Sequence, residues 1–291
     1  MTTTTTTAAT TTGQLAAGGR LDDLSPGAGR RAGRTAFKRW RGRVLRVLVP
    51  VLLIVVWQAA ISLNVISQAT LPSPGTVLKA YKELWSEGSL QAALPISLER
   101  AGIGLLIGAT IGLCLGVFAG LWKIGEEIFD APLQMLRTIP FIALVPLFIT
   151  WFGIDEKPKI ILIATATVFP MYLNTYHGVR SVDVKLIEAG QVFGLSGWRL
   201  ALRVILPSAL PGALTGLRYA TGVALLALVL AEQINSSAGI GYLIESANQN
   251  QRPDIVIAGI LVYAAFGIIA DIIMRLVEHY ALPWRPRVAL G

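Results

Sequence analysis

The sequence offers few side chains that could form a catalytic or metal-binding site. Cys114 is the only cysteine, so the chain can form neither an intramolecular disulfide nor a cysteine-based metal cluster. His177 and His279 stand about a hundred residues apart and lack the four-residue spacing of two ligands on one helix. The dipeptide Gly-Lys does not occur, which excludes a phosphate-binding loop with its lysine. We therefore expect no metal, no bound cofactor and no enzymatic reaction in this chain.

Three charged residues remain as candidates because they lie in or beside long apolar stretches, where a charge is costly. We expect Arg218 to pair inside a helix bundle or to extend its charge towards water, and a role in an anion pathway is the alternative. Asp271 precedes Arg275 by four residues, the spacing of an ion pair on one helix face. Glu232 stands at the end of an apolar stretch, and a role as a gate or docking residue at a substrate entrance is a hypothesis.

The composition indicates that membrane-spanning helices position these residues. Hydrophobic residues make up 54% of the chain and charged residues 14%, against about 25% charged residues in an ordinary soluble domain. The net charge is +8, but residues 1–46 hold nine Lys and Arg and contribute +7 of it. Because the basic residues are confined to one short tail, we exclude nucleic-acid binding, which needs a basic folded face. We predict an all-α integral membrane protein.

Six apolar segments have lengths close to the roughly 17–25 residues that cross a bilayer as a helix. These predicted spans are Val47–Leu63, Ala101–Trp122, Thr138–Ile154, Ile160–Tyr176, Gly212–Ala231 and Ile255–Met274. The second is the clearest, with 22 uncharged residues, and residues 155–159 predict a short hairpin between the third and fourth. Cytoplasmic segments would carry 18 Lys and Arg, and outer segments six, if both termini are inside the cell. This bias predicts cytoplasmic termini.

The chain divides into four predicted regions. Residues 1–43 form a Thr-rich, basic cytoplasmic tail, of which 1–37 should be disordered because large apolar side chains are few. No cleaved signal peptide is expected, since the first apolar run begins near Val44. Residues 44–100 hold the first span and an outer connection, in which Val77 to Trp85 predict an amphipathic helix on the membrane surface or against the bundle. Residues 101–284 form the core, and 285–291 a second cytoplasmic tail.

Two features of the predicted spans concern packing. Glycines recur at every fourth position of the second span and leave one helix stripe without side chains: Gly104, Gly108, Gly112, Gly116 and Gly120. Helix backbones can approach closely along such a stripe, and we expect it to pack within the chain, with a subunit interface as the alternative. Pro140 and Pro146 should kink the third span, and non-ideal helices often line cavities, so this span is expected to line a pathway.

The cytoplasmic segment 181–207 predicts two short helices with a turn between them. Ser181 can cap the first helix, Gly194 supplies the break, Ser196 can cap the second, and Pro207 limits it. Apolar and charged residues are interleaved along the segment, so that one face is apolar and the other is charged. A soluble partner could dock on this segment.

The same segment resembles the cytoplasmic signature of ATP-binding-cassette importer permeases, written Glu-Ala-Ala, three residues, Gly, nine residues, Ile, one residue, Leu-Pro. The matching positions are Glu188, Ala189, Gly190, Gly194, Val204, Leu206 and Pro207. Gly190 stands where the family usually has Ala, and Val204 where it has Ile. Further stretches resemble the nitrate, sulfonate and taurine branch, among them Leu71-Pro72-Ser73-Pro74, Ser97-Leu98-Glu99-Arg100, Arg137-Thr138-Ile139-Pro140 and Ala231-Glu232.

The resemblance implies a type I importer permease in the bacterial cytoplasmic membrane. Such a permease acts as a homodimer with two ATPase subunits, which carry ATP and Mg²⁺, and with an extracytoplasmic solute-binding protein. Segment 181–207 would then be the loop that couples ATP hydrolysis to transport. Its substrate would be a small anion, most simply taurine or another aliphatic sulfonate, with nitrate or a pyrimidine precursor as alternatives.

Two other classes of function fit the sequence less well. A self-sufficient ion-coupled transporter is expected to show inverted repeats, discontinuous helices and acidic residues within the membrane. Only Asp271 fits that pattern, and no repeat is visible. A membrane enzyme would need a metal cluster, a nucleophile with its base, or paired carboxylates, and the sequence offers none of these.

Overall fold

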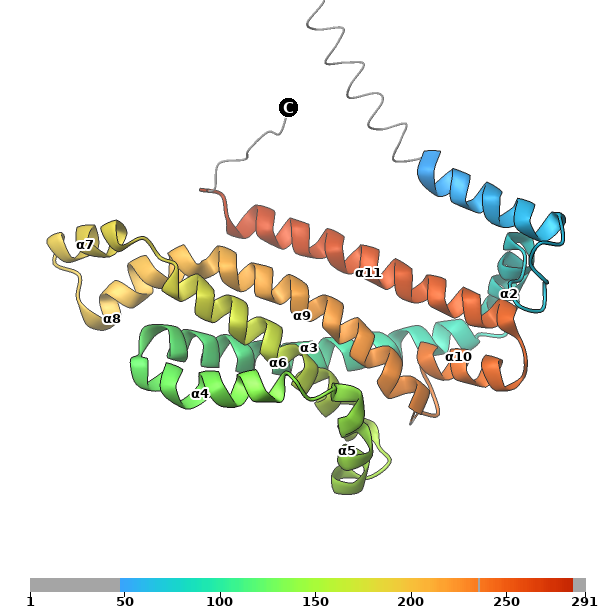
Figure 1. Cartoon of the computed structure of the whole chain (residues 1–291), viewed down its shortest axis with the longest axis horizontal. Coiled ribbons are helices and arrows are strands. Elements are labelled where there is room, and N and C mark those ends of the chain that lie inside the picture. Colours follow the sequence, from blue (N-terminus) through green and yellow to red (C-terminus); the bar gives the residue numbers. More distant parts are fainter. Residues whose placement is uncertain (1–47, 235, 285–291) are drawn as a thin grey trace, which may run out of the picture. The chain divides into compact units, whose positions relative to one another are not determined.

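The computed structural model describes residues 48–234 and 236–284 (Figure 1). The predicted disordered tail and the C-terminal residues 285–291 lie outside the described residues. Within these ranges the regular structure is entirely helical, which confirms the predicted fold class. The chain divides into two compact units, Met1–Trp57 and Gln58–Gly291.

An apolar helix, Leu48–Ser62, precedes the labelled elements. The elements that follow are α2 (Pro74–Ser86), α3 (Ser89–Leu121), α4 (Lys123–Leu136), η1 (Phe141–Leu144), α5 (Val145–Phe152), α6 (Glu156–Arg180), α7 (Val184–Val192), α8 (Gly197–Leu200), η2 (Ala201–Ile205), α9 (Leu206–Ile234), α10 (Ile240–Gln249) and α11 (Pro253–Ala281).

Three described helices are long and apolar enough to cross a membrane: α3, the continuous helix Gly197–Ile234 that ends as α9, and α11. A fourth span exists if α4 and the following helical segment Phe141–Phe152 count as one broken span. Helix α6 has 25 residues, but polar residues such as Thr165, Asn174 and Thr175 reduce its apolar character. Helix Leu48–Ser62 is shorter than a typical span. The predicted number of six therefore exceeds what length and composition establish.

The predicted third span, Thr138–Ile154, is wrong as a single helix. Helix α4 begins at Lys123, in a segment that we expected to be a cytoplasmic connection, and the chain bends by 89° between Leu136 and Phe141. Pro140 lies in this break, where its missing N–H costs no helical hydrogen bond, and Pro146 lies in the first turn of α5. Figure 1 shows α4 alongside α3, with α5 turned away from it.

The core forms where α6 packs along both α3 and α9. One buried cluster joins Ala109 of α3, Met171 of α6 and Ala220 of α9. Every glycine of the predicted stripe faces α6: a Cβ at Gly104 would meet Ile163, and the four that follow along α3 face successive turns of α6 as far as Val179. The α3 backbone can approach α6 closely because these side chains are missing.

The outer connection is more helical than predicted. Helix α2 contains the predicted amphipathic stretch, and its N-cap Ser73 accepts a hydrogen bond from Thr76 N at 3.2 Å. It packs against the bundle, where Tyr81 donates to Ala258 O of α11 at 2.9 Å. Helix α3 starts at Ser89, twelve residues before the predicted span. The short connection predicted at 155–159 lies at residues 153–155 instead, because α5 ends at Phe152 and Glu156 already begins α6.

Candidate functional site

The segment between α6 and α9 starts with α7, a helix of nine residues. Its N-cap is Asp183, whose Oδ1 accepts a hydrogen bond from Lys185 N at 2.9 Å. The prediction of Ser181 as the cap is wrong: its hydroxyl donates to Gly178 O of α6 at 3.2 Å. The acidic side chain two residues later is closer to the free N–H groups of α7, and its charge also suits the helix dipole.

The two glycines of the signature have different structural roles. Gly194 follows α7 and has a left-handed φ of +80°, so it supplies the predicted turn. No atom lies within 4 Å of the position that a Cβ would take there. Gly190 is buried, and a Cβ there would lie 2.8 Å from Leu200 Cδ1 and 3.2 Å from Val204 Cγ2. The glycine therefore lets α7 fold back against the helix that follows. Glu188 and Ala189 are exposed on α7.

The second helix of the segment does not end at Pro207. Residues Gly197–Ile234 form one continuous helix, with a π-helical stretch at Ala201–Ile205 that ends two residues before the proline. The prediction of a stop at Pro207 is wrong because the wider π turn accommodates a residue that lacks an N–H and whose ring crowds the preceding turn. Val204 belongs to this stretch, and Leu206 and Pro207 start α9.

The tip between α7 and α8 exposes apolar side chains to solvent. Val192 and Phe193 are each 85% exposed, and Trp198 is 59% exposed. Three such neighbouring side chains, on a segment bordered by Lys185, Glu188 and Arg199, form an apolar surface with a charged rim. Surfaces of this kind mark protein contacts.

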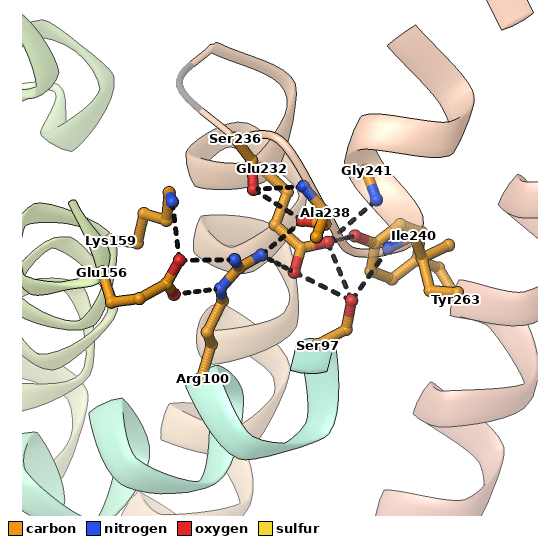
Figure 2. Close-up of polar contacts among 10 residues, drawn as sticks. All are labelled: Ser97, Arg100, Glu156, Lys159, Glu232, Ser236, Ala238, Ile240, Gly241 and Tyr263. Carbon is orange, nitrogen blue, oxygen red and sulfur yellow. Dashed lines mark hydrogen bonds and ion pairs between the residues drawn. The ribbon is translucent and has the colours of Figure 1, made fainter. Parts of the chain in front are cut away.

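A network of buried polar groups occupies the opposite end of α9 (Figure 2). The Glu232 side chain is fully buried, and its carboxylate accepts hydrogen bonds from Ser97 Oγ at 2.8 Å, Arg100 Nη1 at 2.8 Å, Gly241 N at 2.8 Å and Tyr263 Oη at 3.0 Å. These donors come from α3, α10 and α11. The carboxylate therefore fastens α9 to three other helices.

Arg100 connects this network to α6. Its side chain is 4% exposed, and it donates to both oxygens of Glu156, at 2.5 and 2.7 Å, and to Ala238 O at 2.7 Å. Lys159, also buried, donates to Glu156 Oε1 at 2.9 Å. The two buried cations are balanced by the buried carboxylate of Glu232 and by the half-exposed carboxylate of Glu156.

In this structure the Glu232 side chain has no exposed surface and so faces no open entrance, and its role as a gate or docking residue stays a prediction. Sequence reasoning also missed its partners Ser97, Arg100 and Tyr263. Arg100 offered a signal, since it directly precedes the clearest uncharged run of the chain. No local pattern indicated that it pairs with a residue 132 positions later.

Arg218 has a structural partner, as expected. It donates to Glu278 Oε2 at 2.8 Å and lies 3.8 Å from Asp271 Oδ1. Asp271 also forms the predicted pair with Arg275, at 2.7 Å. A cleft of about 200 Å³ between α9 and α11 is lined by Arg218 and Asp271 and by the small residues Gly222 and Gly267. Among the described residues, no group of three His, Cys, Asp or Glu side chains could hold a metal ion.

The geometry defines a class of protein: an all-helical membrane protein whose helices pack closely, with a buried polar network at one end of α9 and an exposed apolar tip at the other. The chain belongs to the family described as binding-protein-dependent transport system inner membrane component, which matches residues 112–280. It is thus a permease subunit of the ABC importer type and not a self-sufficient secondary transporter.

Several relatives cover most of the chain. It is 45% identical over 239 residues to the "Putative aliphatic sulfonates transport permease protein SsuC" of Bacillus subtilis, covering 82% of this chain and 87% of the relative. It is 44% identical over 252 residues to the protein of the same name from Escherichia coli, covering 87% and 96%. It is 34% identical to the taurine transport system permease protein TauC of Escherichia coli, covering 81% and 88%.

Solved structures support the fold. The chain resembles a subunit of an amino acid ABC transporter with a TM-score of 0.58 and 16% identity, covering 70% of this chain and 96% of that one. It resembles a chain of the methionine ABC transporter MetNI in an inward-facing conformation with a TM-score of 0.54 and 17% identity, covering 66% and 97%.

Proposed function

We propose that the chain forms the translocation pathway of an ATP-driven importer for small organic sulfonates, with taurine or another aliphatic sulfonate as substrate. The relatives named for sulfonates and taurine support this substrate class over nitrate or a pyrimidine precursor. The importer is a homodimer of this chain in the bacterial cytoplasmic membrane, with both termini in the cytoplasm. Two ATPase subunits with ATP and Mg²⁺ and an extracytoplasmic solute-binding protein complete it.

The apolar tip of segment 181–207 carries this proposal. Val192 and Phe193 are each 85% exposed, which is unfavourable in water. Burial of both side chains in a cleft of a partner protein would be favourable. In the proposed complex the ATPase subunit receives this tip, so α7 and α8 act as coupling helices. Glu188 and Gly194 then set the charge and the turn of the docked segment.

The helix that leaves the tip suits mechanical transmission. Gly197–Ile234 contains 38 residues without interruption, and at 1.5 Å per residue this corresponds to about 57 Å. A displacement of the docked end by closing ATPases would thus reach the network around Glu232 at the far end. Because Glu232 holds α3, α10 and α11, movement of one helix would reposition several spans and alternate the opening of the pathway.

The proposal is tested by purifying the chain from its native membrane in mild detergent and identifying copurified proteins by mass spectrometry. We expect a stoichiometric ATPase, whose hydrolysis is stimulated by the binding protein with an alkanesulfonate. Phe193→Asp should abolish copurification without affecting membrane insertion, because the side chain makes few contacts in the chain itself. The control Val65→Asp, on a residue that is 72% exposed and distant from the tip, should retain the ATPase. Uptake by the lone chain driven by an ion gradient would contradict the proposal.

A further inference from the structure

The break between α4 and α5 places a cation at an unexpected depth. The four residues 137–140 separate α4 from η1, and Arg137 is exposed at the start of the break. Its Cζ lies 5.3 Å from the centroid of the Phe169 ring on α6. The lysine and arginine bias had placed Arg137 in a cytoplasmic connection, but the structure puts it beside the middle of a core helix.

Contacts between α4 and α6 fix this depth. Arg180, at the end of α6, pairs with Glu126 in the first turn of α4, and Tyr172 donates to Asp130 Oδ1 at 3.3 Å one turn later. The two helices therefore run antiparallel from the inner end of α6. Phe169 is 13 residues from Glu156 and 11 from Arg180, which corresponds to about 20 Å and about 16 Å from the two ends. Arg137 thus lies near mid-depth.

Arg137 lacks the carboxylate partner that comparable arginines have. Outside segment 181–207, the other described arginines all pair with Asp or Glu: Arg100, Arg180, Arg218, Arg252 and Arg275. No carboxylate oxygen of a described residue lies within 4.0 Å of the Arg137 guanidinium, and its N–H groups form no hydrogen bond there. A charge at this depth is too costly to face lipid, so in the assembled protein it faces water, an anion or a group of a neighbouring chain.

We propose that Arg137 binds the sulfonate group of the substrate in the translocation pathway. The contact with the Phe169 ring positions the guanidinium, while its N–H donors stay available for an anion with several oxygens. Ile139 and Ile142, 43% and 45% exposed beside the break, offer apolar contact to an alkyl tail. The break supplies the site because an irregular backbone within a membrane is tolerated where it lines a water-filled cavity.

This inference rests on the proposed function, and one transport experiment separates the two. The complete transporter, with its ATPase and binding protein in proteoliposomes, is assayed for uptake of ethanesulfonate. Arg137→Gln should lower kcat/KM about 10- to 100-fold, the loss expected for a charge-assisted hydrogen bond, while hydrolysis of ATP without substrate is unchanged. Arg137→Lys should be intermediate. The control Arg275→Gln, which removes an exposed ion pair on α11, should match the wild type.

The outcomes are distinct. Uptake by Arg137→Gln equal to that of the wild type overturns this inference and leaves the proposed function intact. If the wild type itself fails to take up alkanesulfonates, the proposed substrate is wrong and the inference falls with it. If Arg137→Gln dissociates the complex on native mass spectrometry, the guanidinium pairs with a neighbouring chain and the inference is also wrong.

A chemical measurement provides an independent readout. Since Cys114 is the only cysteine of the chain, Cys114→Ala combined with Arg137→Cys leaves a single thiol at the break. An anionic, water-soluble methanethiosulfonate reagent should modify this thiol in at least one nucleotide state, and ethanesulfonate should slow the modification. No modification in any nucleotide state, as for a position in lipid, would overturn the inference.

Discussion

The contact between α3 and α6 can be tested with two identical substitutions in one helix. A Cβ on Gly116 would lie 2.7 Å from the backbone oxygen of Tyr172 and 2.7 Å from Thr175 Cβ, whereas ordinary contacts begin at 3.4 Å. Gly116→Ala therefore requires the two backbones to separate by about 0.7 Å, and overpacking of this kind costs about 1–3 kcal/mol. Gly102 lies on the same helix with no atom within 4 Å of its Cβ position, so Gly102→Ala is the matched control.

Because both variants replace glycine by alanine in α3, the gain in helix propensity of about 1 kcal/mol is common to both and cancels in their comparison. The assay is thermal unfolding of the purified chain in detergent. In domains of 150–250 residues, each kcal/mol of lost stability lowers the unfolding temperature by about 2–4 °C. A loss of about 1–3 kcal/mol should therefore make Gly116→Ala unfold several degrees below Gly102→Ala. Equal unfolding temperatures would refute the tight contact between α3 and α6.

Three further outcomes are expected. Gly194→Leu should lower stability by about 1–2 kcal/mol, because leucine is strained at a left-handed turn. The variant should still insert into the membrane but lose substrate-stimulated ATP hydrolysis in the assembled transporter. Normal stimulation would exclude a role for the turn in coupling. Glu232→Gln should lower the free energy of unfolding by about 3 kcal/mol, because the buried Arg100 loses one of its two carboxylate partners. The control Glu278→Gln, on a more exposed side chain, should change the unfolding temperature little. Hydrogen bonding to Arg252 lowers the pKa of Glu83 below 4.5, so this contact stabilises the fold above pH 4.5 and is lost as the pH falls through the lowered pKa. The difference in unfolding temperature between wild type and Glu83→Gln should accordingly disappear in acid, and a difference independent of pH would show that the charge of Glu83 is unimportant.

The break in the third predicted span shows where hydropathy reasoning fails. Thr138–Ile154 is apolar enough to cross a membrane, but hydropathy does not record that Pro140 ends the hydrogen-bond ladder or that Lys123–Leu136 is itself helical. Helix α4 also carries the acidic residues Glu126 and Asp130 towards α6. They are accommodated because Tyr172, Tyr176 and Arg180 of α6 supply their hydrogen-bond partners.

Segment 181–207 shows a similar division. Spacing alone located the signature and the turn at Gly194, because a left-handed turn favours glycine and the motif is local. The sequence could not reveal that the second helix continues into α9, since a π-helical stretch before Pro207 depends on how α7 packs against it.

The sequence by itself determined the apolar helices, the stripe of glycines on one face of α3 and the Asp271–Arg275 pair, because these follow from composition and from helical periodicity over a few residues. Only the tertiary structure decided which carboxylates neutralise the arginines whose partners lie on other helices. Glu232 meets Ser97 and Arg100 across more than 130 residues, and Arg137 is left without a carboxylate among the described residues. Such pairs depend on the register in which α3, α6 and α9 pack, and that register is a property of all three helices together.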